Sequence, residues 1–340
     1  MKCTNEKTER KKSGQVKGWH GKGRFCAVLL FCAAALTGCG AEKYAMPYDS
    51  NYPVSSFKLV SVDDVQVAEP FAVDLCVVDK DVSNSAASVA DVASAALFDI
   101  NGKNTLYARN ANEQLDPASL TKIMTALVAL KHGSPDQLLR ASDNVLITEP
   151  GAQLCGIKPG DTMTLDQALH IMLLNSANDA AVMIAEGVSG SVSAFVDLMN
   201  QEALALGATN CHFTNPNGLT EEGHYMTAYD LYLIFVEAIQ YDLFNEIIQM
   251  SSYSTTYTLS DGSERTLEIN NTNQYLTGNV QAPEHITVIG GKTGTTKAAG
   301  HCLILLSRNS SGNPYISVIM NSDSTENLYK NMSELLNATQ

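Results

Sequence analysis

The chain lacks the cysteine and histidine spacings that are typical of metal sites. Its eight cysteines include no Cys-x-x-Cys pair, and its seven histidines include no His-x-x-x-His pair. Because zinc sites commonly draw ligands from such pairs, we expect no metal ion and no other cofactor. Four cysteines lie beyond residue 39, and their wide spacing favours small buried side chains over a disulfide framework. These four are Cys76, Cys155, Cys211 and Cys302.

Basic residues are scarce outside the first 38 positions. Residues 1–38 hold eight of the 22 Lys and Arg residues but only two of the 36 Asp and Glu residues, which leaves 14 basic and 34 acidic residues in the remainder. A body this acidic repels the phosphates of nucleic acid. We therefore expect no nucleic-acid partner.

Long apolar runs are also absent, because the run from Phe25 to Leu36 is too short for an ordinary membrane-spanning helix. It follows a basic segment and ends in small residues, as secretory signals do. Leu36-Thr-Gly-Cys39 resembles the bacterial lipobox, in which the cysteine is lipidated. We expect a lipoprotein signal peptide over residues 1–38 and a lipid on Cys39, over the alternatives of an uncleaved anchor or an ordinary cleavage site. The protein would then be exported and anchored by lipid to the outer face of the bacterial cytoplasmic membrane.

Residues 39–90 are rich in Ser, Asp and Val and show little helical period. We interpret them as a tether and leading strands, with 71–78 as the best strand. Residues 91–340 form the main domain. An Asn101-Gly102 turn between two short apolar runs predicts a β-hairpin, and Thr164 with Gln167 predicts a helix capping box. Further patterns predict helices over 165–174, 179–186, 193–206, 227–239 and 327–336, and strands over 253–259, 287–290, 300–307 and 315–320.

This order predicts an α+β fold. An antiparallel sheet draws strands from both ends of the domain and packs on helices, and an all-α cluster is inserted between. Asp116 and Pro117 suit the N-cap and first position of a helix that holds Ser119 and Lys122 on one face. Such a pair can act as a serine nucleophile and its base, although alone it equally suits an ordinary first-turn serine and a solvated lysine.

Three short motifs occur in order, namely Ser119-x-x-Lys122, Ser176-x-Asn178 and Lys292-Thr-Gly294. This trio is shared by class A β-lactamases and penicillin-binding proteins. Each motif alone is weak, because the chain repeats it elsewhere. The repeats are Ser55-x-x-Lys58, Ser142-x-Asn144, Ser307-x-Asn309 and Lys12-Ser-Gly14. We reject the main rival, Ser142-x-Asn144, because it lies among loop residues close after Ser119, whereas Ser176 falls at a junction between two predicted helices.

Four segments, 116–127, 174–181, 213–219 and 291–302, resemble the serine D-alanyl-D-alanine carboxypeptidases of the S11 peptidase family, the low-molecular-mass penicillin-binding proteins. The resemblance covers residues 90 to 338. It implies a β-lactamase/transpeptidase-like fold and a penicillin-binding D,D-peptidase domain over 91–340. It also implies removal of the terminal D-Ala from peptidoglycan stem peptides in cell-wall maturation, with β-lactam antibiotics as covalent inhibitors.

The resemblance also implies a role for each motif. Ser119 forms the acyl-enzyme and Lys122 is its base, while Ser176 and Asn178 relay protons and position the substrate. Lys292 supports them electrostatically. The strand Lys292-Thr293-Gly294-Thr295 binds substrate, with Lys292 and Thr293 on the terminal carboxylate. The backbone N–H groups of Ser119 and Thr295 would form the oxyanion hole.

Two other functions stay open from the sequence. A serine β-lactamase shares the trio, but it needs a carboxylate that activates the deacylating water, and no Glu-x-x-Leu-Asn segment lies between Asn178 and Lys292. A non-catalytic peptidoglycan-binding lipoprotein would have no need for Lys122. A lysine acts as a base only when neutral, and burial near a second cation such as Lys292 would favour that form.

Overall fold

The computed structural model describes residues 73–339. The signal peptide expected over 1–38, the lipid site Cys39 and the tether up to residue 72 lie outside the described residues. Within 73–90 the structure differs from the expected leading strand, because residues 73–78 form a turn and irregular chain. The backbone N–H of buried Cys76 donates to the hydroxyl of Tyr232, and the Cys76 carbonyl accepts from Tyr229. This apolar segment therefore packs on a helix and joins no sheet as a strand.

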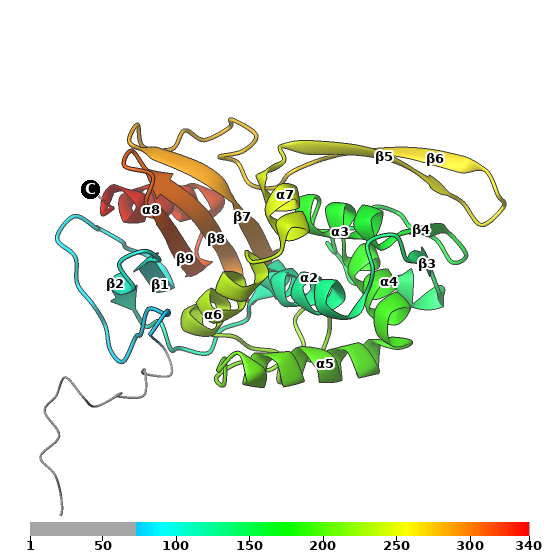
Figure 1. Ribbon diagram of the computed structural model, residues 1–340, viewed down its shortest axis with the longest axis horizontal. Helices are drawn as coiled ribbons and strands as arrows, with labels where there is room; N and C mark the ends of the chain where they lie inside the picture. Colours follow the sequence, from blue (N-terminus) through cyan, green and yellow to red (C-terminus); the bar gives the residue numbers. More distant parts are fainter. Residues whose placement is uncertain (1–72, 340) are drawn as a thin grey trace, which may run out of the picture. The chain divides into compact units, whose positions relative to one another are not determined.

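An antiparallel sheet of order β2-β1-β9-β8-β7 organises the domain (Figure 1). The hairpin and the drawing of strands from both ends of the domain are confirmed. Strand β7 is the free edge of this sheet, since β8 is its one neighbour there. The strands are β1 (Val92–Asp99), β2 (Asn104–Arg109), β7 (Ile286–Thr296), β8 (Gly300–Asn309) and β9 (Pro314–Ser322).

Both faces of the sheet are covered, so its strands are apolar on both sides. Along β1, Leu97 faces helix α8 (Thr325–Asn337), whereas Phe98 faces the helical block. This alternation follows from the two-residue period of a strand. The Phe98 ring stacks on Tyr232 with 4.1 Å between ring centroids.

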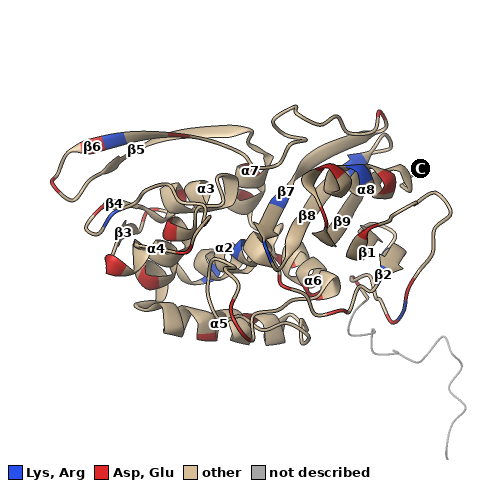
Figure 2. Ribbon diagram, turned by 180° about the vertical axis from the view of Figure 1, so that it is seen from behind, with Lys and Arg blue, Asp and Glu red and all other residues tan. Residues whose placement is uncertain are grey.

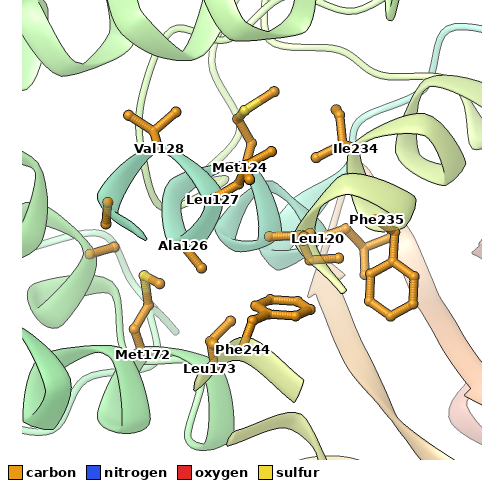
Figure 3. Packing of buried hydrophobic residues seen from close by; sticks show 14 of the residues in the cluster. Leu120, Met124, Ala126, Leu127, Val128, Met172, Leu173, Ile234, Phe235 and Phe244 are labelled. Atoms are coloured by element: carbon orange, nitrogen blue, oxygen red, sulfur yellow. The ribbon is translucent and has the colours of Figure 1, made fainter. Parts of the chain in front are cut away.

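Helix α2 (Thr121–His132) runs through the middle of the helical block. Its residues from Thr121 to Ala129 are all buried, as expected for a helix that is surrounded on every side. Figure 3 shows side chains of α2 between those of α3, α6 and α7. The surrounding helices are α3 (Leu165–Leu174), α4 (Asn178–Ser189), α5 (Val192–Ala205), α6 (Ala228–Ala238) and α7 (Asp242–Gln249).

The capping box at Thr164 is confirmed, because its hydroxyl accepts from the Gln167 N–H while the Gln167 side chain accepts from the Thr164 N–H.

Helix α7 and a second sheet of order β3-β4-β5-β6 were not anticipated. Its long β5–β6 hairpin extends away from the body in Figure 1. The strands are β3 (Leu138–Arg140), β4 (Thr162–Thr164), β5 (Ser252–Thr258) and β6 (Glu264–Asn270).

Within residues 73–339, no single helix is long and apolar enough to cross a membrane. Helices α4 and α5, which meet at an 85° bend, reach that length and apolar composition only when they are counted together.

The start of the Ser119 helix was placed wrongly. Ser119 lies in a short 3₁₀ turn, η3 (Ala118–Leu120), and α2 begins only at Thr121. No side chain caps η3, so Asp116 is not an N-cap. The reason is local, because Ala118 has φ +48° and a left-handed residue interrupts an α-helix.

Candidate active site

Three distant segments meet at a cleft with a volume of about 950 Å³. They are the η3–α2 junction, the turn between α3 and α4, and the free edge of β7. Figure 2 shows basic positions on α2 and β7, the helix and the strand that meet there. The cleft brings together most of the expected site residues, and those that line it are Ser119, Ser176, Asn178, Thr293, Gly294 and Thr295.

Lys122 is the hub of the site although no part of it reaches solvent. Its Nζ lies 2.8 Å from Ser119 Oγ, 2.7 Å from Asn178 Oδ1 and 2.5 Å from the backbone oxygen of Asn217. One turn of helix separates Ser119 from Lys122, and the contact shows that the two side chains share a face despite the 3₁₀ start.

Burial holds the pKa of Lys122 well below its ordinary value, and the nearby Lys292 lowers it further while Asp179 opposes the shift. A neutral amine has two hydrogens and one lone pair. The oxygens of Asn178 and Asn217 can only accept hydrogen bonds, so they take both hydrogens. The lone pair is then left for the Ser119 hydroxyl, which is the arrangement that a general base requires.

Lys292 is the second buried amine, and it is 1% exposed. It donates to Ser176 Oγ at 2.9 Å and to the Thr293 backbone oxygen at 2.8 Å. Burial lowers its pKa to about 7, so it exchanges its proton near neutral pH. Because Ser176 Oγ accepts from Lys292, the Ser176 hydroxyl hydrogen is free to point into the cleft. Ser176 itself has φ +64°, a sparsely populated conformation that is typical of functional sites.

Two glycines allow the segments to approach each other. A Cβ on Gly294 would lie 3.1 Å from the Ser119 backbone nitrogen, and a Cβ on Gly218 would lie 1.9 Å from the Ala118 oxygen. Gly218 also has φ +81°, which favours glycine. The β7 edge and the 213–219 loop can therefore both pack directly against the turn that carries Ser119.

Several supporting residues carried no assigned role in the sequence. Asn217 acts through its carbonyl, which every residue has, so no side-chain pattern could reveal it. Asp179, 1% exposed, accepts from the backbone N–H groups of Cys155, Gly156 and Ile157 and so fixes the loop beyond Gln153, which lines the cleft.

Buried His224 supports the 213–219 loop, which carries Asn217. Its Nδ1 accepts from the Thr214 backbone N–H at 3.1 Å, so the ring hydrogen lies on Nε2 and points at Thr121 Oγ1, 2.9 Å away. His224 thereby joins the 213–219 loop to the first residue of α2. Burial is the main cause that lowers its pKa to about 4, and it outweighs the opposing effect of Glu221.

The rejected motif Ser142-x-Asn144 has a structural use. Ser142 Oγ caps the short turn η4 (Asp143–Val145) by accepting from the Asn144 N–H. Its hydroxyl and the Asn144 amide both donate to the carboxylate of Glu186, each at 2.6 Å. Neither residue lines the cleft.

The four cysteines of the described chain are unpaired thiols, and three of them are buried while Cys211 is half-buried. Among residues 73–339, no group of three or more His, Cys, Asp or Glu side chains could hold a metal ion.

The sequence matches a family model described as D-alanyl-D-alanine carboxypeptidase over residues 81–324. It is 36% identical over 216 residues to the D-alanyl-D-alanine carboxypeptidase DacF of Bacillus subtilis (strain 168), which covers 62% of this chain and 52% of that protein. It is 33% identical over 219 residues to a D-alanyl-D-alanine endopeptidase of Pseudomonas aeruginosa, covering 62% of this chain and 66% of that protein. The chain thus spans about half the length of curated relatives such as DacF.

Among solved structures, the Streptomyces K15 DD-transpeptidase is similar with a TM-score of 0.68 at 25% identity, over 74% of this chain and 98% of that chain. This likeness and the antiparallel sheet packed on helices confirm the expected α+β, transpeptidase-like fold.

We predict that His224 makes the protein acid-sensitive. The pKa of His224 is about 4 in the folded protein and 6.5 for an ordinary histidine, so the unfolded chain takes up the proton at a higher pH than the folded protein does. Stability should therefore be lost from pH 6.5 down to pH 4, by about 3 kcal/mol in total. Urea unfolding at a series of pH values measures this. His224→Gln should flatten the pH dependence in that window, and the exposed His132→Gln should not. Equal slopes for wild type and His224→Gln would contradict the assignment.

Proposed function

The chain belongs to the D-alanyl-D-alanine carboxypeptidase family of S11 peptidases, and on that premise we propose that it is a serine D,D-carboxypeptidase. Its substrates are peptidoglycan stem peptides that end in D-Ala-D-Ala, from which it removes the last residue during cell-wall maturation. One observation carries the proposal, namely the contact of the buried Lys122 amine, whose pKa burial lowers, with Ser119 Oγ at an open cleft. A protein that only binds peptidoglycan has no use for such an amine.

The proposed reaction uses these groups in turn. Ser119 Oγ attacks the carbonyl carbon between the two D-alanines while its proton passes to Lys122 Nζ. The backbone N–H groups of Ser119 and Thr295 stabilise the tetrahedral oxyanion. When the C–N bond breaks, the Lys122 proton reaches the leaving amine through the Ser176 hydroxyl, and Asn178 holds the substrate amide. Water then hydrolyses the Ser119 ester by the reverse proton path.

The segment Lys292 to Thr295 belongs to the edge strand β7, and the substrate pairs with that edge as an added strand. Gly294 is the point where β7 comes closest to Ser119. Lys292 places positive charge beside Ser176 and the terminal carboxylate. The side chain of Thr293 is held by Thr272, whose hydroxyl lies 2.6 Å from its own. Both threonines line the cleft and keep that wall polar.

The location of the enzyme is part of the proposal. The basic head, the apolar run and Cys39 in the sequence support export and a lipid anchor on the outer face of the cytoplasmic membrane. A lipid on Cys39, followed by a tether, would hold the domain near its cell-wall substrate. β-Lactam antibiotics are its covalent inhibitors because they present a strained amide to Ser119.

Ser119→Ala should abolish D-Ala release from a peptide that ends in D-Ala-D-Ala, since no other group can carry the acyl intermediate. The measurement is D-alanine appearance with purified full-length protein. Ser55→Ala, which removes the second Ser-x-x-Lys match, is the matched control and should keep wild-type activity. Wild-type protein that releases no D-Ala would overturn the proposed function.

Lys122→Met should slow acylation of Ser119 by a fluorescent penicillin by roughly 100-fold to 10,000-fold, the range expected for loss of a general base. Methionine fills a similar volume without a proton acceptor, so the fold should be retained. Lys158→Met, an exposed lysine, is the control and should acylate at the wild-type rate. Unchanged acylation in Lys122→Met would remove Lys122 from the base role.

The acyl-enzyme formed with penicillin should be stable, because the sequence has no Glu-x-x-Leu-Asn segment between Asn178 and Lys292 to activate water for its hydrolysis. Label that persists on the protein for many turnover times of the peptide substrate supports the carboxypeptidase. Rapid loss of the label with accumulation of hydrolysed drug favours the β-lactamase.

A further inference from the structure

His301 is a titratable residue of the cleft that the reaction above does not use. It is the second residue of β8 and pairs in register with Thr295 of β7. Side chains at directly paired positions lie on the same face of a sheet. Thr295 and His301 therefore stand side by side, and both line the cleft that holds Ser119.

Two hydroxyl groups position the His301 ring. Its Nδ1 lies 3.1 Å from Thr325 Oγ1 at the start of α8 and 3.4 Å from Thr295 Oγ1. The Nε2 atom has no hydrogen-bond partner within residues 73–339. Whenever Nδ1 accepts from a hydroxyl, or the ring is protonated, Nε2 carries a hydrogen. An anion in the cleft would favour these two states, because it can then receive the Nε2–H.

The cleft needs such a donor for a free carboxylate. Lys292 is buried, has a pKa of about 7, and already gives two hydrogens to Ser176 and to its neighbour Thr293. It therefore supplies only part of a positive charge at neutral pH. The basic side chains that line the cleft in the described chain are His301 and the exposed Lys297.

The acidic groups around this end of the cleft are few. Glu149 lines the cleft, and Glu326 lines an adjoining hollow that shares Thr325 with it. Asp323, in the turn before α8, accepts hydrogen bonds from the Ser324 hydroxyl and the Asn327 side-chain amide. The start of α8, with its partial positive charge, also supports an anion near Thr325.

We propose that His301, held by Thr325 and Thr295, donates from Nε2 to the free carboxylate of the terminal D-alanine and so sets a preference for chain ends over internal bonds. This inference rests on the proposed carboxypeptidase function. A peptide that continues past this residue, or is amidated there, presents an amide at the same place, which cannot receive a charge-assisted hydrogen bond of equal strength. His301 thus selects a carboxypeptidase reaction over an endopeptidase reaction.

The test compares two peptides that differ only at the end, one with a D-Ala-D-Ala acid and one with a D-Ala-D-Ala amide. Full-length wild type, His301→Leu and His301→Gln are assayed for cleavage of both. We expect His301→Leu to lower kcat/KM for the acid at least tenfold, mainly through KM, with little change for the amide. His301→Gln, which keeps an N–H donor, should recover part of the loss. His212→Leu, whose ring bonds the Gly223 oxygen outside the cleft, is the control.

The outcomes separate the two proposals. Equal losses for the acid and the amide, or no recovery in His301→Gln, would show a structural role and overturn the inference. If His301→Leu kept the wild-type ratio of kcat/KM for the acid to kcat/KM for the amide, the inference would be overturned as well, while the carboxypeptidase function would stand. A wild type that cleaves neither peptide would overturn both.

Discussion

The burial of the Lys122 amine among three oxygens is the constraint on which the site depends. An ammonium ion without solvent is unfavourable unless it is paired with a negative charge, and the three contacts of Nζ are to a hydroxyl, an amide and a carbonyl. Burial lowers the pKa of the amine and so favours its neutral form, which needs no negative partner. The burial that would destabilise a charged lysine therefore favours the form that the proposed base beside Ser119 requires.

Each of the three oxygens comes from a different part of the chain, and this explains much of the architecture. Asn178 stands at the start of α4, Asn217 belongs to the 213–219 loop, and Ser119 sits in a turn that Gly218 and Gly294 allow to be approached closely. The helical block is wrapped around α2 so that these segments converge on its first turn. Displacing Asn178 or Asn217 would leave an N–H of Lys122 without a partner, and displacing Ser119 would leave its lone pair without one.

The sequence could predict the side chains of this site but not all of its geometry. Ser119, Lys122, Ser176 and Lys292 were found because their chemistry depends on residue type and occurs in a fixed order. The carbonyl of Asn217 has no such signature, and the left-handed Ala118 that turns the expected helix start into a 3₁₀ turn is a non-glycine residue with nothing unusual around it in sequence. The apolar residues around Cys76 suggested a strand, yet the hydroxyls of Tyr229 and Tyr232 take its backbone groups. Those partners are more than 150 positions away, so local pattern could not reveal them.

The two buried lysines also link catalysis to stability. For Lys292 the folded pKa of about 7 lies below the ordinary 10.5, so the unfolded chain binds more protons between those two values. Below pH 7 this group therefore lowers the stability of the folded state by about 5 kcal/mol. This loss shrinks as the pH rises from 7 to 10.5. A substrate carboxylate beside Lys292 would offset part of that contribution by pairing with the charged form. The empty site is therefore less favourable than the site with an anionic group beside Lys292.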